Sequence, residues 1–230
     1  MSAPITLLAG AVAGLAVGSL LVPLTRRELA AAVSRSSASA GDATAATQDV
    51  SPPRVTRGQW ITLAVVSGLL PSYVLHRVGW SPNALPPLLL LVGLVQLAYC
   101  DLTRRLLPKT LVYALSVAVI GSGVIVALST SEWDRLVLAS LGAITSFALF
   151  FVVNLMNPRW MAFGDVRLSL VFGFGLAWVS PIDLLEAFFY ANVLAVVVGL
   201  VLIAANRADR KSALPFGVFM AVGAALVLIT

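Results

Sequence analysis

Two aspartates in this chain of 230 residues stand at the ends of long apolar segments. Asp101 closes one segment and Asp165 opens another. When two carboxylates lie within a few ångströms of each other, they cannot both ionise cheaply, so the pair shares a proton. One aspartate can then act as a general base on water while the protonated one polarises the carbonyl under attack. This is the chemistry of an aspartic peptidase, and it needs neither a metal ion nor a nucleophilic side chain.

A purely structural explanation of the same two residues stays open at this point. Both could be helix-end residues that pair with neighbouring arginines, and Asp165 suits the first turn of a helix, where the helix dipole favours negative charge. Cys100 directly precedes Asp101, so a cysteine nucleophile is the other possibility. The chain has one histidine, His76, and the apolar segments and basic loops considered next predict that it lies across a membrane from Cys100. This excludes a Cys–His pair, and Cys100 is interpreted as a small packing residue.

The composition predicts that membrane-spanning helices carry these aspartates. Hydrophobic residues make up 60% of the chain and charged residues 11%, with a mean hydropathy of +0.98. A soluble domain carries roughly a quarter charged residues. Only helices and closed barrels cross a bilayer, and the apolar runs here lack the alternation of barrel strands. The expected fold is therefore an all-α, polytopic bundle of transmembrane helices.

About eight apolar stretches come close to the ~20 residues that a transmembrane helix needs. The second and the sixth are short and are expected to be tilted or incompletely spanning. The approximate bounds are Ile5–Leu24, Trp60–Leu75, Ala84–Cys100, Thr110–Leu128, Leu136–Met156, Leu168–Val179, Leu184–Ala204 and Ala213–Ile229.

The basic residues predict the orientation of these helices. With the N-terminus outside, thirteen of the fifteen Lys and Arg residues fall in inner loops, and only Arg77 and Arg135 lie outside. Such a bias is typical of membrane proteins, whose cytoplasmic loops are rich in Lys and Arg. It accounts for the net charge of +5 without nucleic acid as a partner. It also places Asp101 and Asp165 at the same cytoplasmic membrane face.

The chain is expected to divide into three parts. Residues 1–24 form a first transmembrane helix with Gly10, Gly14 and Gly18, a stripe of small residues that lets another helix approach closely. Residues 25–58 are a basic cytoplasmic linker, rich in Ala, Ser and Thr and too poor in large apolar residues to form a core. Residues 59–230 form a seven-helix membrane core that carries both aspartates.

Three segments resemble the prepilin peptidases, membrane aspartic peptidases of the GxGD class that trim the leaders of type IV pilins and pseudopilins. Asp101 to Pro108 is similar to the first catalytic aspartate of that family and the Leu-Pro turn after it. Phe163-Gly164-Asp165-Val166-Arg167-Leu168 is similar to the GxGD segment with the second aspartate. Leu214 to Phe219 is similar to a Pro-Phe-Gly-Pro-Phe signature in the last helix.

The resemblance implies an aspartic endopeptidase of the bacterial cytoplasmic membrane, with its active site facing the cytoplasm. Its expected substrate is a prepilin or pseudopilin, with no cofactor and no metal. Asp101 and Asp165 are the expected catalytic residues. The expected supporting or substrate-binding residues are Pro108, Ala162, Phe163, Gly164 and Arg167. Arg167 is also expected to contact lipid phosphates.

The chain departs from the family pattern in places that bear on function. Ala162 stands where GxGD has its first glycine, and Val218 stands where the second proline of the last signature is usual. Longer members carry paired cysteines in the first cytoplasmic loop, which are associated with zinc and with N-methylation of the new pilin terminus. Residues 26–58 contain no cysteine. We therefore expect cleavage without methylation.

Two other functions remain as alternatives. A proton-coupled transporter also uses paired intramembrane carboxylates, although it would place them near the midplane, often with inverted repeats. A catalytically inactive homologue that helps assemble a pilus or secretion machine is compatible with Ala162. The sequence predicts neither the oligomeric state nor which pilin is cut.

Overall fold

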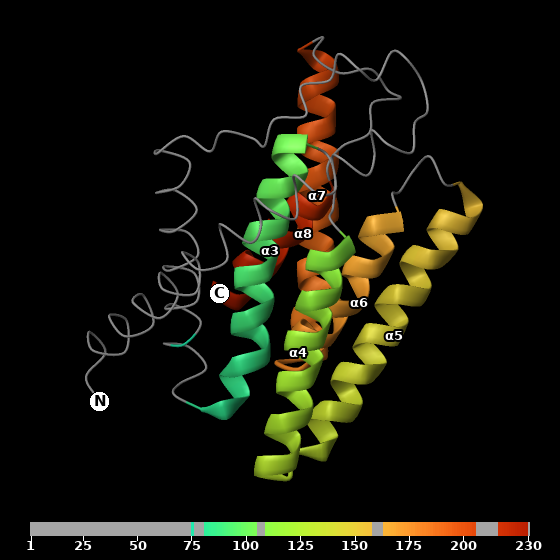
Figure 1. Ribbon diagram of the computed structural model, residues 1–230. Helices are drawn as coiled ribbons and strands as arrows, with labels where there is room; N and C mark the ends of the chain where they lie inside the picture. Colours follow the sequence, from blue (N-terminus) through green and yellow to red (C-terminus); the bar gives the residue numbers. More distant parts are fainter. Residues whose placement is uncertain (1–74, 76–80, 105–108, 158–162, 206–215, 230) are drawn as a thin grey trace, which may run out of the picture.

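The computed structural model describes residues 75, 81–104, 109–157, 163–205 and 216–229. These residues form an all-helical bundle without strands in the described ranges (Figure 1). A short 3-10 helix, η2 (Pro82–Ala84), leads into α3 (Leu85–Arg104). The remaining helices are α4 (Lys109–Thr130), α5 (Trp133–Met156), α6 (Phe163–Ala177), α7 (Pro181–Ala204) and α8 (Phe216–Ile229). The described core is thus built from six α-helices.

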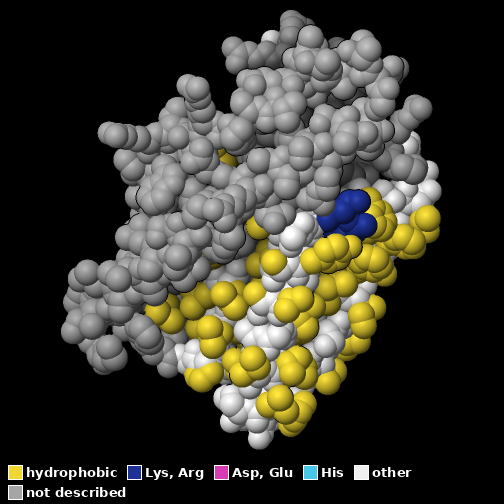
Figure 2. Space-filling model, in the orientation of Figure 1, with side chains coloured by type: hydrophobic (Ala, Val, Ile, Leu, Met, Phe, Trp, Pro, Cys, Tyr) yellow, Lys and Arg dark blue, Asp and Glu magenta, His cyan; other side chains and the backbone are white. Residues whose placement is uncertain are grey.

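Four helices in the described part of the chain are long and apolar enough to cross a membrane. They comprise Pro82–Leu102, Lys109–Thr130, Trp133–Met156 and Pro181–Ala204. Large apolar side chains remain exposed along them, as hydrocarbon contact allows, for example Val117, Leu155 and Leu185. Figure 2 shows hydrophobic side chains over much of the described surface on one face, interrupted by a single small patch of Lys or Arg. The chain is therefore a membrane protein.

The predicted helix bounds agree with the structure to within a few residues for six of the eight segments. The sixth segment is short as expected, because α6 has only 15 residues. In the last segment α8 covers Phe216–Ile229, and the predicted start at Ala213 lies outside the described residues. The first predicted span, the linker, almost all of the second span and the predicted outside position of the N-terminus lie outside the described residues, so the full count of eight remains a prediction.

The short helix α6 is the centre of the described bundle. Every residue from Val171 to Ala177 is buried, so the second half of this helix is covered on all sides. Its closest neighbour is α5, where small residues allow the backbones to approach. A Cβ added to Gly173 would meet the carbonyl oxygen of Gly142 and the Ser146 hydroxyl, and this contact would force the helices apart. Small residues at a helix interface are the usual means of close packing inside membranes.

Helix starts and turns follow local chemistry. The Ser180 hydroxyl accepts a hydrogen bond of 3.1 Å from the Ile182 N–H, and Pro181 follows as the first residue of α7. Such capping satisfies an N–H group that has no partner within the helix. Ser131, with a φ of 60°, makes the tight turn between α4 and α5. These signals determine where the chain reverses and hence which helix ends meet.

Candidate active site

The two aspartates lie at the same end of the bundle. Asp101 is in the last turn of α3, and Asp165 is the third residue of α6. In Figure 1 the end of α3 and the beginning of α6 both lie toward the upper end of the bundle. Both side chains are withdrawn from the surface, with 4% of Asp101 and 5% of Asp165 exposed. Buried carboxylates are costly unless other groups compensate, so their presence here requires a specific environment.

The first turn of α8 reaches the Asp101 carboxylate. A Cβ atom built on Gly217 would lie 3.1 Å from Oδ2 of Asp101 and 3.7 Å from Cδ2 of Leu168. Leu168 lies one turn after Asp165 on α6. Gly217 therefore marks a point at which α3, α6 and α8 converge. Gly217 belongs to the segment from Leu214 to Phe219 that is similar to the last signature, and it was not among the predicted site residues.

The seam between α5 and α6 holds the helix that carries Asp165. Ser169, one turn after Asp165, donates a hydrogen bond of 2.8 Å to the Val166 carbonyl and contacts the Ser146 carbonyl at 3.4 Å. Gly173 follows one turn later in the same seam. Asp165, Ser169 and Gly173 are thus spaced by four residues, which places them along one side of α6. The close packing of α5 against α6 therefore determines the position of Asp165 along the axis of the bundle.

Five phenylalanine rings pack the first turn of α8 against α5, α6 and α7. The ring of Phe216 lies 5.7 Å from that of Phe150 on α5 and 6.5 Å from that of Phe219. Phe150 packs at 5.2 Å against Phe188 on α7, which in turn lies 4.9 Å from Phe172 on α6. We call these five residues the aromatic cluster. It links four helices beside the point where Gly217 meets Asp101.

The Arg167 side chain packs against two aromatic rings. Its guanidinium lies 4.6 Å from the ring centroid of Phe163 and 5.5 Å from that of Tyr113 on α4. Arg167 follows Asp165 by two residues, and residues two apart lie on opposite sides of a helix. Phe163, which was predicted to support the site, has a half-exposed ring that contacts Arg167. Gly164, which lies between Phe163 and Asp165 in the chain, is half-buried. Pro108 and Ala162 lie outside the described residues.

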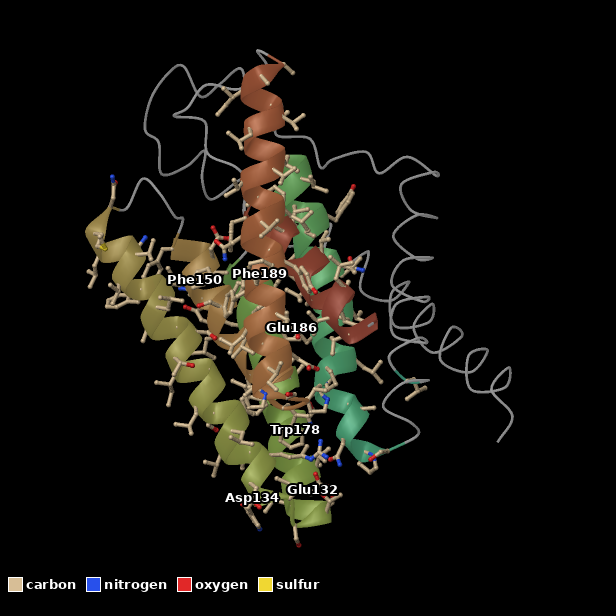
Figure 3. The ribbon with its side chains drawn as sticks, turned by 180° about the vertical axis from the view of Figure 1, so that it is seen from behind. Glu132, Asp134, Phe150, Trp178, Glu186 and Phe189 are labelled. Carbon is tan, nitrogen blue, oxygen red and sulfur yellow. The ribbon has the colours of Figure 1, made fainter. Side chains whose placement is uncertain are left out.

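The three acidic residues labelled in Figure 3 lie away from this site. Glu132 and Asp134 lie at the opposite end of the bundle, and Glu186 is exposed on α7 between the two ends (Figure 3). Cys100 is buried beside Asp101, as its interpretation as a packing residue requires. Across the described ranges, no three His, Cys, Asp or Glu side chains come together as a metal site would require. The prediction that no metal is needed stays a prediction.

Comparison with known proteins assigns this arrangement to a family. Residues 88–205 match the model of the type IV leader peptidase family, a range that begins in α3, ends just after α7 and contains both aspartates. The chain is 30% identical over 171 residues to a prepilin leader peptidase/N-methyltransferase of Legionella pneumophila, covering 73% of this chain and 56% of the relative. A protein of the same name from Stutzerimonas stutzeri is 27% identical over 167 residues, covering 70% and 55%.

A third similar protein, the prepilin leader peptidase/N-methyltransferase of Pseudomonas aeruginosa, is 25% identical over 170 residues, covering 72% of this chain and 56% of that relative. The chain thus spans little more than half the length of the curated relatives it matches. No solved structure matches the chain.

Proposed function

Since the chain belongs to the type IV leader peptidase family, we propose that it is a membrane aspartic endopeptidase that removes the leader of a prepilin or pseudopilin. The observation that carries this proposal is the burial of Asp101 and Asp165 at one end of the bundle, on two helices that meet at Gly217. A transporter is less well supported, because its paired carboxylates belong near the membrane midplane. Here both aspartates lie at helix ends.

In this mechanism the apolar helix of the substrate lies in the bilayer and its basic leader stays on the cytoplasmic side. The scissile bond then reaches the headgroup level in an extended conformation, beside both aspartates. One carboxylate takes a proton from water as the water attacks the peptide carbonyl, and the other, protonated, donates to the carbonyl oxygen. The first aspartate then passes the proton that it took from water to the amide nitrogen, and the C–N bond breaks to release the amine. The second aspartate takes back a proton from the tetrahedral intermediate, which leaves as a carboxylic acid, so that the pair again shares one proton. Burial of both groups strengthens these interactions by excluding water.

The proposal is limited to cleavage. The relatives carry the name of a bifunctional peptidase and N-methyltransferase, and the resemblance links methylation to paired cysteines in the first cytoplasmic loop. This sequence has a single cysteine, Cys100, which lies in α3. We therefore expect the mature substrate to carry an unmethylated amino terminus when this protein is the only processing enzyme present.

The test is co-expression of a tagged prepilin with the wild type, Asp101→Asn and Asp165→Asn in cells without other leader peptidases. Wild-type protein should remove the leader, and each variant should reduce removal by at least about 1,000-fold, since the catalytic carboxylate is lost. Asp134→Asn is the matched control, because Asp134 is exposed at the other end of the bundle. Mass spectrometry of the mature N-terminus separates cleavage from methylation.

Two results would overturn the proposal. Leader removal by either asparagine variant at the wild-type rate would show that the aspartates are not catalytic. A wild type that leaves the leader intact, although membrane-inserted and stable, would favour the inactive assembly factor. Proton uptake that depends on both aspartates in such a preparation would instead favour a proton-coupled carrier.

A further inference from the structure

The beginning of α8 leaves no room for a side chain next to Asp101. A methyl group on Gly217 would lie 3.1 Å from Oδ2 of Asp101, closer than the 3.4–4 Å of an ordinary van der Waals contact. The carboxylate would have to shift by a few tenths of an ångström to admit it. Interiors this closely packed transmit such a shift instead of absorbing it. The position of the Asp101 carboxylate therefore depends on the residue at 217.

The same turn of α8 is held from the other side by the aromatic cluster. Phe216 directly precedes Gly217, and its ring packs on Phe150 from α5. Aromatic pairs of this kind contribute about 0.5–1.5 kcal/mol beyond the area they bury. Further along α8, Gly223 lies against the backbone of Ala187 and Ala191 on α7. These two contacts, of Phe216 and of Gly223, determine the position of α8 along the axis of the bundle. They therefore determine where Gly217 contacts Asp101.

We propose that Phe216 and Gly217 are positioning residues for Asp101. In this arrangement Phe216 anchors the first turn of α8 to α5, and Gly217 presents bare backbone that limits where the carboxylate can lie. The inference rests on the proposed peptidase function and adds to it the reason why a third helix is part of the site. Misplacing a catalytic group by about 1 Å can reduce a rate about 100-fold, so a single methyl group here should be felt in catalysis.

Substitution at Gly217 is the direct test. Gly217→Ala should lower kcat for prepilin cleavage at least tenfold, leave KM within twofold and move the pH–rate profile, because the carboxylate is displaced and the substrate is not. Gly121→Ala is the matched control, since nothing lies within 4 Å of the added methyl group. A merely structural role for Gly217 predicts the opposite pattern, with a lower melting temperature and an unchanged pH profile.

The anchor has its own pair of variants. Phe216→Ala should lower kcat in the same way, whereas Phe216→Tyr should restore most of it, because a ring remains to pack on Phe150. Phe189→Ala is the control, since that ring is largely exposed on α7. Wild-type kinetics for both Gly217→Ala and Phe216→Ala, in a protein that still requires Asp101, would overturn the positioning role.

A cross-link separates failure of this geometry from failure of the peptidase function. The Cγ atom of Asp101 lies 3.8 Å from the Cβ point of Gly217, so cysteines at 101 and 217 should form a disulfide on mild oxidation. The double variant Asp101→Cys/Gly217→Cys is made with Cys100→Ser, and a protease site between residues 205 and 216 makes the cross-link visible on a gel. A cross-link at this pair, together with a wild type that leaves the prepilin leader intact, overturns only the proposed function. Absence of a cross-link, with the same pair failing under a bismaleimide, overturns the inference.

Discussion

The indole N–H of Trp178 donates a hydrogen bond of 3.1 Å to the backbone carbonyl of Asn83, 95 residues earlier in the chain. The side-chain amide of Asn83 in turn donates to Glu132 at 2.8 Å, and Glu132 pairs with Arg135. This network joins the start of α3, the start of α5 and the end of α6. It lies at the end of the bundle away from the aspartates, where Figure 3 shows Trp178 and Glu132. The network determines the position of α3 relative to α6 along the axis of the bundle. Since these helices carry Asp101 and Asp165 at their other ends, it also affects how the two aspartates are aligned.

Trp178→Phe should therefore destabilise the protein although the ring stays buried. The substitution removes the donor and leaves the Asn83 carbonyl without this hydrogen bond, a cost of about 1–3 kcal/mol. Trp133→Phe, on a half-exposed ring at the start of α5, should have little effect. Thermal unfolding in detergent or nanodiscs compares the two. Equal melting temperatures for both variants would show that the hydrogen bond of Trp178 contributes nothing.

Gly173→Ala should separate α5 from α6 and displace Asp165. The new methyl group meets the Gly142 carbonyl, which belongs to the backbone and cannot rotate away. Overpacking of this kind costs about 1–3 kcal/mol. We expect a lower melting temperature together with slower prepilin cleavage. A wild-type melting temperature together with a wild-type cleavage rate would mean that the contact between α5 and α6 is not closely packed and does not position Asp165.

Arg167→Ala should leave cleavage within a few-fold of the wild-type rate, because the guanidinium lies over Phe163 and Tyr113. Loss of the two ring contacts should cost about 1–2 kcal/mol of stability, and Arg167→Lys should recover part of it. Melting temperatures and leader-removal rates are measured on the same preparations. A stable Arg167→Ala protein that no longer cleaves would place Arg167 in the active site after all.

Labelling from the two sides of intact cells should determine the orientation. In a Cys100→Ser protein, a cysteine at Asp134 should react with a membrane-impermeant maleimide added outside, and one at Lys109 should react only after the membrane is opened. Both side chains are exposed, so accessibility is decided by the membrane. The reverse pattern would place the aspartates at the outer face and would contradict the proposed approach of the prepilin leader from the cytoplasm.

The sequence alone determined the class of fold and the helix bounds of the described region. Hydrocarbon tolerates only structures that satisfy their own backbone, so long apolar runs such as Lys109–Thr130 and Pro181–Ala204 had to be helices. Polar and turn-forming residues between these runs set the helix ends to within a few residues. The positions of Asp101 and Asp165 at the ends of their helices follow from the same pattern.

Only the tertiary structure decided what surrounds those aspartates. The central place of α6, the contact of Gly217 with Asp101 and the turn of Arg167 toward Tyr113 all join segments that are distant in the chain. Hydropathy cannot predict them, because lipid-facing and buried sides of a membrane helix are equally apolar. Close packing between small residues and rings selects one arrangement among many. Gly217 shows the difference most clearly: in the sequence it is a glycine near the start of an apolar run, and in the bundle it lies against Asp101.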